Sequence, residues 1–468
     1  MTEPELPHSF WATVREAIRG SRHHDYTEGP IGRAIILLAI PMVMEMFMES
    51  LFMIVDIFWV AHLGADAIAT VGLTESMLAL VYTVAMGLSI GLGAMVARRI
   101  GEKNPAGAAE AAVQGIAVGL MVAAVTGTLG AVFAPRLLGV MGASPEVIAV
   151  GSGYTRVMLG GNAVILLLFL INATFRGAGD AAIAMRVLWL ANWINILLGP
   201  CLIFGVGPFP RLGVQGAAIA TTIGRGIGVL YQIYRLMRRD GRIVIHREQL
   251  ALRPAVMRAM LRLSGAGTFQ VLVHTASWIG LVKIISTFGA QAVAGYTVGV
   301  RIIIFALLPS WGLANAAATM VGQGLGAKKP ERAERAVWIA GLYNMYFLGA
   351  VGLVFVILAG PIVAVFTQDA AVAPVAVSCL RIVSCGYLFY AWGMVLTQSF
   401  NGAGDTWTPT WLNFFCFWLW EIPLAWVLAV SFGLGPSGVF LAITIAFSTL
   451  AVASAVLFRR GGWKLRHV

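Results

Sequence analysis

The same short motifs occur twice in this chain, with a constant spacing of 225 residues between the copies. The GAGD motif at 177–180 returns at 402–405, each time two residues after a phenylalanine, and LGA at 63–65 returns as FGA at 288–290. One spacing shared by markers spread over more than 100 residues indicates two homologous halves joined head to tail. Further pairs at this spacing are Gly87 and Gly312, Gly101 and Gly326, Pro105 and Pro330, and Arg156 and Arg381.

The composition places these halves in a membrane. The chain is 59% hydrophobic and 11% charged, whereas soluble domains average roughly 25% charged residues. Apolar stretches of about 20 residues, long enough to cross about 30 Å of hydrocarbon, recur along the whole length. They are continuous rather than alternating, which excludes a β-barrel. Internal symmetry in such a protein is typical of transporters, with the substrate handled between the halves.

We therefore predict an all-α polytopic membrane protein with twelve transmembrane helices in two six-helix bundles. The first bundle is expected at 31–236 and the second at 258–460, flanked by an N-terminal segment at 1–30, a basic linker at 237–257 and a tail at 461–468. Residues 9–22 are predicted as either an amphipathic surface helix or a disordered tail. The expected spans are 33–59, 66–97, 108–134, 146–174, 182–206, 213–236, 258–285, 291–322, 332–358, 371–399, 408–431 and 436–458.

Basic residues define the orientation. The net charge of +11 gathers in alternate loops, as after the second and eighth spans, while the opposite loops carry little beyond Arg136 and Arg211. This pattern predicts cytoplasmic termini and a multi-pass protein of a bacterial or archaeal plasma membrane. The charge needs no nucleic-acid partner, and residues 1–30 lack the apolar core of a signal peptide. The four cysteines lie in or beside apolar runs and imply no disulfide framework.

The first span carries three carboxylates, Glu45, Glu49 and Asp56. At about 100° per residue they share one narrow stripe of a helix. Because carboxylates are costly in hydrocarbon, the stripe is expected to face protein or a wet cavity. It is read either as a cation-handling site or as a structural hydrogen-bond network, and Glu45 is alternatively solvated near the cytoplasm. Beside the stripe, Met42, Phe52 and Met53 are candidates for an adaptable cavity wall, or else for ordinary packing.

Other polar residues lie inside later spans. At the 225-residue spacing, the three carboxylates correspond to Gln270, His274 and Leu281, so the second half has no acid on this face. Further candidates for the substrate cavity are Asn192, Gln270, His274 and Glu421. Asn192 shares a helix face with Asn195, close to a Gly199-Pro200 pair, and Thr221 lies early in the next span.

These features together resemble the multidrug and toxic compound extrusion (MATE) family over residues 30–460. The matching motifs are Ile40-Pro41, Val55-Asp56, Leu63-Gly64-Ala65, Arg176-Gly177-Ala178-Gly179-Asp180, Asn195 with Pro200, Gly213-Val214 and Val321-Gly322-Gln323. The resemblance implies a two-bundle antiporter that expels amphipathic organic cations in exchange for H⁺ or Na⁺.

The resemblance also implies a coupling site. The cation ligands of prokaryotic members map to Asp56, Asn195, position 199 and Thr221. Position 199 is glycine here, so an expected carboxylate is absent, leaving Glu45 or Glu49 as substitutes or Asp56 alone as a protonation switch. The second-half site of other members maps to Gln270, Gly386 and Tyr390 and is lost.

We accordingly expect an efflux antiporter with coupling in residues 33–236, centred on Asp56 and supported by Asn195 and Thr221, with Glu45 and Glu49 nearby. Its expected partners are small organic substrates and membrane lipids, with no cofactor beyond the coupling ion, in a monomer. A flippase for lipid-linked saccharides is the alternative. No motif of an integral-membrane enzyme is present.

Overall fold

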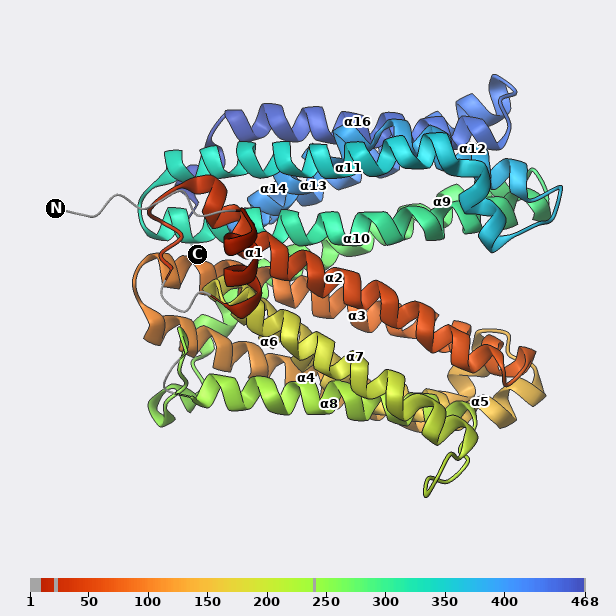
Figure 1. The fold of residues 1–468 in the computed structure, drawn as a ribbon, viewed down its shortest axis with the longest axis horizontal. Coiled ribbons are helices and arrows are strands. Elements are labelled where there is room, and N and C mark those ends of the chain that lie inside the picture. The colour runs from red at the N-terminus through yellow and green to blue at the C-terminus, as the bar shows by residue number, and fades with distance from the viewer. Residues whose placement is uncertain (1–9, 21–23, 239–240, 467–468) are drawn as a thin grey trace.

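The described residues, 10–20, 24–238 and 241–466, form helices joined by short turns in this computed structural model, with no β-strand in these ranges (Figure 1). The helices are α1 (Phe10–Arg19), α2 (Ile31–Ala61), α3 (Ala65–Gly101), α4 (Pro105–Val140), α5 (Pro145–Gly160), α6 (Asn162–Ala178), α7 (Ala181–Phe204), α8 (Val214–Met237), η1 (Arg247–Leu250), α9 (Pro254–Ser286), α10 (Ala290–Gly326), α11 (Pro330–Phe366), α12 (Ala373–Cys385), α13 (Tyr387–Gly402), α14 (Trp407–Asn413), η2 (Phe414–Glu421), α15 (Ile422–Trp426), η3 (Val427–Ser431), α16 (Pro436–Arg459) and η4 (Gly462–Leu465).

The all-α membrane architecture is confirmed, and each predicted span lies on a helix, on a helix pair or, for 408–431, on the run of four helical segments from α14 to η3. Ten continuous stretches of the described chain are long and apolar enough to cross a membrane, and the bent pair α12–α13, with an angle of 61°, makes an eleventh. The twelfth predicted span is α8, a 24-residue helix that is more polar because it carries Arg225, Gln232 and Arg235. The expected surface helix is α1, whereas residues 1–9, 21–23, 239–240 and 467–468 lie outside the described chain.

The backbone repeats with the same spacing as the motifs. Helix α10 begins and ends 225 residues after α3, and the break between α5 and α6 at Gly161 corresponds to the break between α12 and α13 at Gly386. Left-handed residues recur in the same way: Gly64 and Gly289 have φ of 100° and 98°, and Lys103 and Lys328 have φ of 57° and 56°. The two halves therefore use the same turns.

The two halves form two bundles. Bundle 1 contains α3–α8, and bundle 2 contains α10–α16. They lie close together at the end where both termini lie and farther apart at the opposite end (Figure 1). The first helix of each half contacts both bundles. Leu38 and Met42 of α2 belong to a core with Val337 and Phe400 of bundle 2, whereas the carbonyl of Met44 accepts a hydrogen bond from Trp189 of α7.

Glycines allow the bundles to approach closely at the end with the termini. A Cβ atom on Gly101 would stand 2.1 Å from the carbonyl oxygen of Gln323, and one on Gly326 would stand 2.2 Å from the carbonyl oxygen of Arg98. These two contacts exchange repeat-related positions between α3 and α10, so the helices cross about an approximate two-fold axis. Nothing larger than hydrogen fits at either crossing, and the bundles are closed here.

Candidate functional site

Glu45 lies in a buried polar network inside bundle 1. Its carboxylate, 1% exposed, accepts hydrogen bonds from Arg176 at 2.8 Å and from Asn172 at 3.1 Å. Gln232 of α8 in turn donates to the Asn172 side chain at 2.6 Å. Glu45 is therefore not solvated, and its charge is compensated by a guanidinium from α6, which connects α2 to the end of that helix.

Glu49 is compensated by a second arginine, Arg225 of α8, at 3.3 Å. Arg225 is 4% exposed, donates a hydrogen bond to the hydroxyl of Tyr82 at 2.8 Å, and lies over the ring of Phe52 with 5.3 Å between its guanidinium carbon and the ring centroid. Sequence analysis did not consider Arg225. The signal was an arginine in the middle of a predicted span, where a charge needs a partner inside the protein.

Asp56 differs from the other two carboxylates of the stripe. It is partly buried in α2, yet its carboxylate makes no hydrogen bond or ion pair with any described residue. The charges of Glu75 in α3 and Arg225 in α8 act on it from a longer distance. Glu75, also within a predicted span, was likewise missed by sequence analysis. Asp56 is thus the carboxylate of the stripe that has no direct counter-charge among the described residues.

The predicted supporting residues are partly brought together. The side-chain amide of Asn195 donates to the hydroxyl of Thr221 at 2.6 Å, and both residues are buried. Asn192 instead donates to the carbonyl of Met48 at 3.3 Å. No hydrogen bond joins Asp56 to the Asn195–Thr221 pair. A Cβ atom at Gly199 would meet only Trp59, at 3.9 Å, so that position has room for a side chain.

The residues predicted to line a substrate cavity lie in different environments. Met42 is fully buried where α2 meets α10, Phe52 contacts Arg225, and Met53 is 50% exposed. In the second half, Gln270 is buried with its carbonyl oxygen unpaired. His274 packs edge-on to Phe417 with ring centroids 5.0 Å apart.

Glu421 is 1% exposed at the end of the π-helical segment η2. Its carboxylate forms no ion pair with any described residue. Within the described ranges, no three His, Cys, Asp or Glu side chains come together as a metal site.

Two pseudo-symmetric helical bundles that meet at one end, with buried ion pairs where α2 packs against bundle 1, define an integral-membrane transporter. The family model MatE matches residues 41–201 and 268–427, more than half of the chain. The chain belongs to the MatE family, whose members are membrane transporters and not enzymes.

Individual relatives agree with this assignment over nearly their whole length. A probable multidrug resistance protein NorM of Thermotoga maritima is 25% identical, covering 94% of each chain. A FAD transporter of Shewanella oneidensis is 25% identical over 93% of this chain and 96% of its own. A solved outward-facing conformation of a multidrug resistance MATE family transporter superposes with a TM-score of 0.87 at 27% identity, covering 93% of this chain and 96% of that one.

Proposed function

We propose that this protein is an ion-coupled exporter of amphipathic, mostly cationic organic compounds, with Asp56 as the coupling group. The observation that carries this proposal is the difference among the three carboxylates of α2. Arg176 compensates Glu45 and Arg225 compensates Glu49, whereas Asp56 has no such partner among the described residues. A carboxylate without a fixed counter-charge in a membrane span can exchange a proton or a cation at the lowest cost.

The coupling follows from what each state of Asp56 would favour. An ionised Asp56 carries a charge that interacts with Arg225 and Glu75, whereas a proton removes this charge and a bound cation balances it. A change of charge inside bundle 1 thereby shifts the equilibrium between arrangements of α2, α3 and α8. Asn195 and Thr221 support the site from α7 and α8, and Glu45 and Glu49 act as the fixed charges around it.

Relatives from Thermotoga maritima and Bacillus subtilis are named probable multidrug resistance proteins, which favours drug-like substrates, whereas the relative from Shewanella oneidensis is named a FAD transporter. A flippase for lipid-linked, anionic saccharides would favour a strongly basic cleft. Arg176 and Arg225, which lie beside the carboxylate stripe of α2, are instead each matched by a glutamate, which favours the exporter.

Asp56→Asn tests the proposal in proteoliposomes in which pH and Na⁺ gradients are imposed separately. We expect the variant to retain substrate binding and to lose gradient-driven efflux by about 100-fold, because Asn cannot exchange a proton and binds cations weakly. Asp66→Asn, the same change at an exposed position of α3, is the matched control and should transport normally. Wild-type coupling in Asp56→Asn would refute the assignment. The gradient that drives wild-type efflux identifies the coupling ion.

A further inference from the structure

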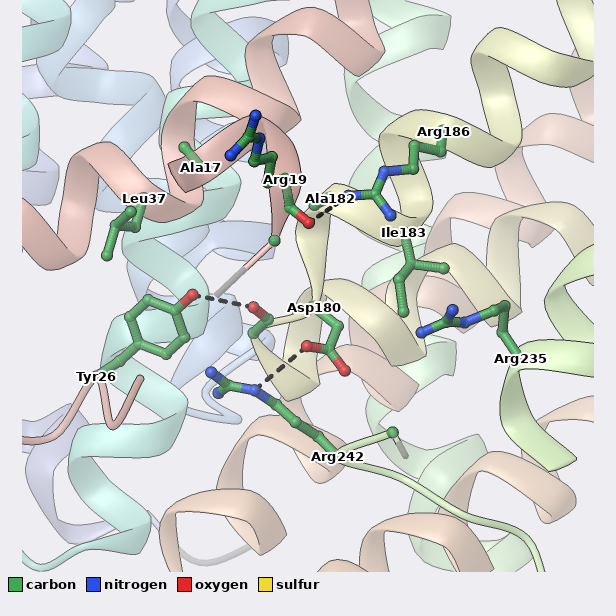
Figure 2. Close-up of a pocket in the computed structure, with 13 residues that line it drawn as sticks. Ala17, Arg19, Tyr26, Leu37, Asp180, Ala182, Ile183, Arg186, Arg235 and Arg242 are labelled. Atoms are coloured by element: carbon green, nitrogen blue, oxygen red, sulfur yellow. Dashed lines mark hydrogen bonds and ion pairs between the residues drawn. The ribbon is translucent and has the colours of Figure 1, made fainter. Parts of the chain in front are cut away.

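A pocket on the side of the termini is lined by arginines from several segments (Figure 2). We call it the arginine pocket: Arg19 at the end of α1, Arg186 of α7, Arg235 of α8 and Arg242 of the linker, with Asp180 as its acid. The carboxylate of Asp180 forms an ion pair with Arg242 at 3.2 Å. Among the described residues of the lining, four arginines thus stand against one acid.

Arg235 has no counter-charge among the described residues. Its side chain points into the pocket from α8 (Figure 2) and is only 8% exposed. Its Nε is buried without an acceptor, and no ion pair with a described residue compensates it. A buried N–H donor without an acceptor is unfavourable. An anion in the pocket would supply the missing acceptor.

The other arginines are held in place around this position. Arg186 donates hydrogen bonds to the carbonyl of Ile18 at 3.0 Å and to that of Arg19, at the C-terminal end of α1. Arg242 donates to the carbonyl of Ala178 at 3.2 Å in addition to its ion pair. Such fixed guanidinium groups match the several oxygens of a phosphate group, whose geometry allows bidentate contacts.

Helix α1 indicates which kind of molecule carries the phosphate group. Phe10 is 58% exposed, Trp11 75% and Ile18 36%, and at about 100° per residue they lie on one face of α1. Arg15 and Arg19 lie on the adjoining face, and a shallow hollow along α1 is lined by Trp11, Val14, Arg15, Ile18 and Arg19, the last of which also lines the arginine pocket. An exposed apolar face next to basic residues is typical of a helix that lies in the membrane interface.

We propose that the arginine pocket binds the phosphate of an anionic phospholipid from the leaflet on the side of the termini. The phosphate contacts Arg235, with Arg19 and Arg186 beside it. The acyl chains run along the apolar face of α1. A free phosphate ion could contact the same arginines, but it has no acyl chains to pack against the apolar face of α1.

The test uses the purified full-length protein and three probes: phosphatidylglycerol, phosphatidylcholine and inorganic phosphate. Native mass spectrometry counts bound lipids, and thermal unfolding measures stabilisation by each probe. We expect phosphatidylglycerol to bind about 10-fold more tightly than phosphatidylcholine. Arg235→Gln should lose about 10-fold in phosphatidylglycerol affinity, which corresponds to about 1.4 kcal/mol. Arg235→Lys should retain most of the binding, because it keeps the charge.

Two further variants keep the test independent of folding. Arg19→Gln alters an exposed side chain and should weaken phosphatidylglycerol binding about 3-fold. Arg335→Gln, the same change at an exposed position of α11 outside the pocket, should leave it unchanged. Equal phosphatidylglycerol affinities of the wild type and of the Arg235→Gln and Arg19→Gln variants would overturn the site. Stabilisation by inorganic phosphate without any preference for phosphatidylglycerol would overturn the lipid assignment.

Discussion

Gly101→Ala should open the contact between the bundles on the side of the termini. In the structure, the added Cβ would stand 2.1 Å from the carbonyl oxygen of Gln323, whereas Cβ contacts shorter than 3.0 Å are essentially never observed. The clashing atom is backbone, so no side-chain rotation relieves it, and α3 must move away from α10. Gly326→Ala has the same effect from the other helix, because its added Cβ would stand 2.2 Å from the carbonyl oxygen of Arg98.

The expected magnitude follows from the cost of overpacking, about 1–3 kcal/mol. This strain exists only while the two helices are in contact, so it raises the free energy of the closed arrangement and not of the arrangement that is open on this side. With about 2 kcal/mol, the ratio of closed to open protein should fall roughly 30-fold, since about 1.4 kcal/mol corresponds to a factor of ten.

The assay is a distance measurement by electron spin resonance. Spin labels at Ala106 of α4 and Glu331 of α11 report the separation of the bundles, because both positions are exposed and lie on different bundles. The background needs serine at Cys201 and Cys385, the two cysteines that are not buried. Gly93→Ala is the control, since its nearest contact would be an ordinary 3.8 Å. Identical distance distributions for Gly101→Ala and the wild type would refute the reasoning.

Two further predictions concern the site in bundle 1. Arg176→Gln should lower thermal stability by about 3 kcal/mol, because it leaves the carboxylate of Glu45 buried without its counter-charge; the double variant with Glu45→Gln should recover most of the loss, and an equal loss in both would contradict the pairing. Gly199→Asp should tighten Na⁺ binding about 10-fold in calorimetry, because the side chain has room one turn from Asn195 and adds an oxygen ligand. Gly72→Asp, at an equally open position of α3, should leave Na⁺ binding unchanged, and equal affinities of Gly199→Asp and the wild type would contradict the proposed ligand geometry.

The helices themselves were accessible to sequence analysis. Long apolar stretches must be helical in a bilayer, because every backbone polar group needs a partner inside the segment. Their expected bounds therefore agree closely with the structure, as for 66–97 against α3 and 213–236 against α8. The break at Gly161 and the strong bend at Gly386 were not predicted, since both pairs of helices read as one continuous apolar stretch.

The partners of the charges were not accessible in the same way. The helical period places Glu45, Glu49 and Asp56 on one stripe, but it carries no information about the groups that face the stripe. Arg176 and Arg225 reach these carboxylates from more than 100 residues away in the chain. An arginine inside a span predicts that an acidic partner lies nearby. Which acid that is depends on how the helices pack against one another.

The sequence by itself determined an all-helical membrane protein built from two related halves, because hydrophobic length and a constant spacing are properties of the chain read in order. The tertiary structure alone decided that two of the three carboxylates in α2 are neutralised, while Asp56 has no direct partner in the described part of the chain. It also gathered Arg19, Arg186, Arg235 and Arg242 around one pocket. Both outcomes depend on electrostatic contacts between distant segments, which fall off with distance in space and not with separation along the chain.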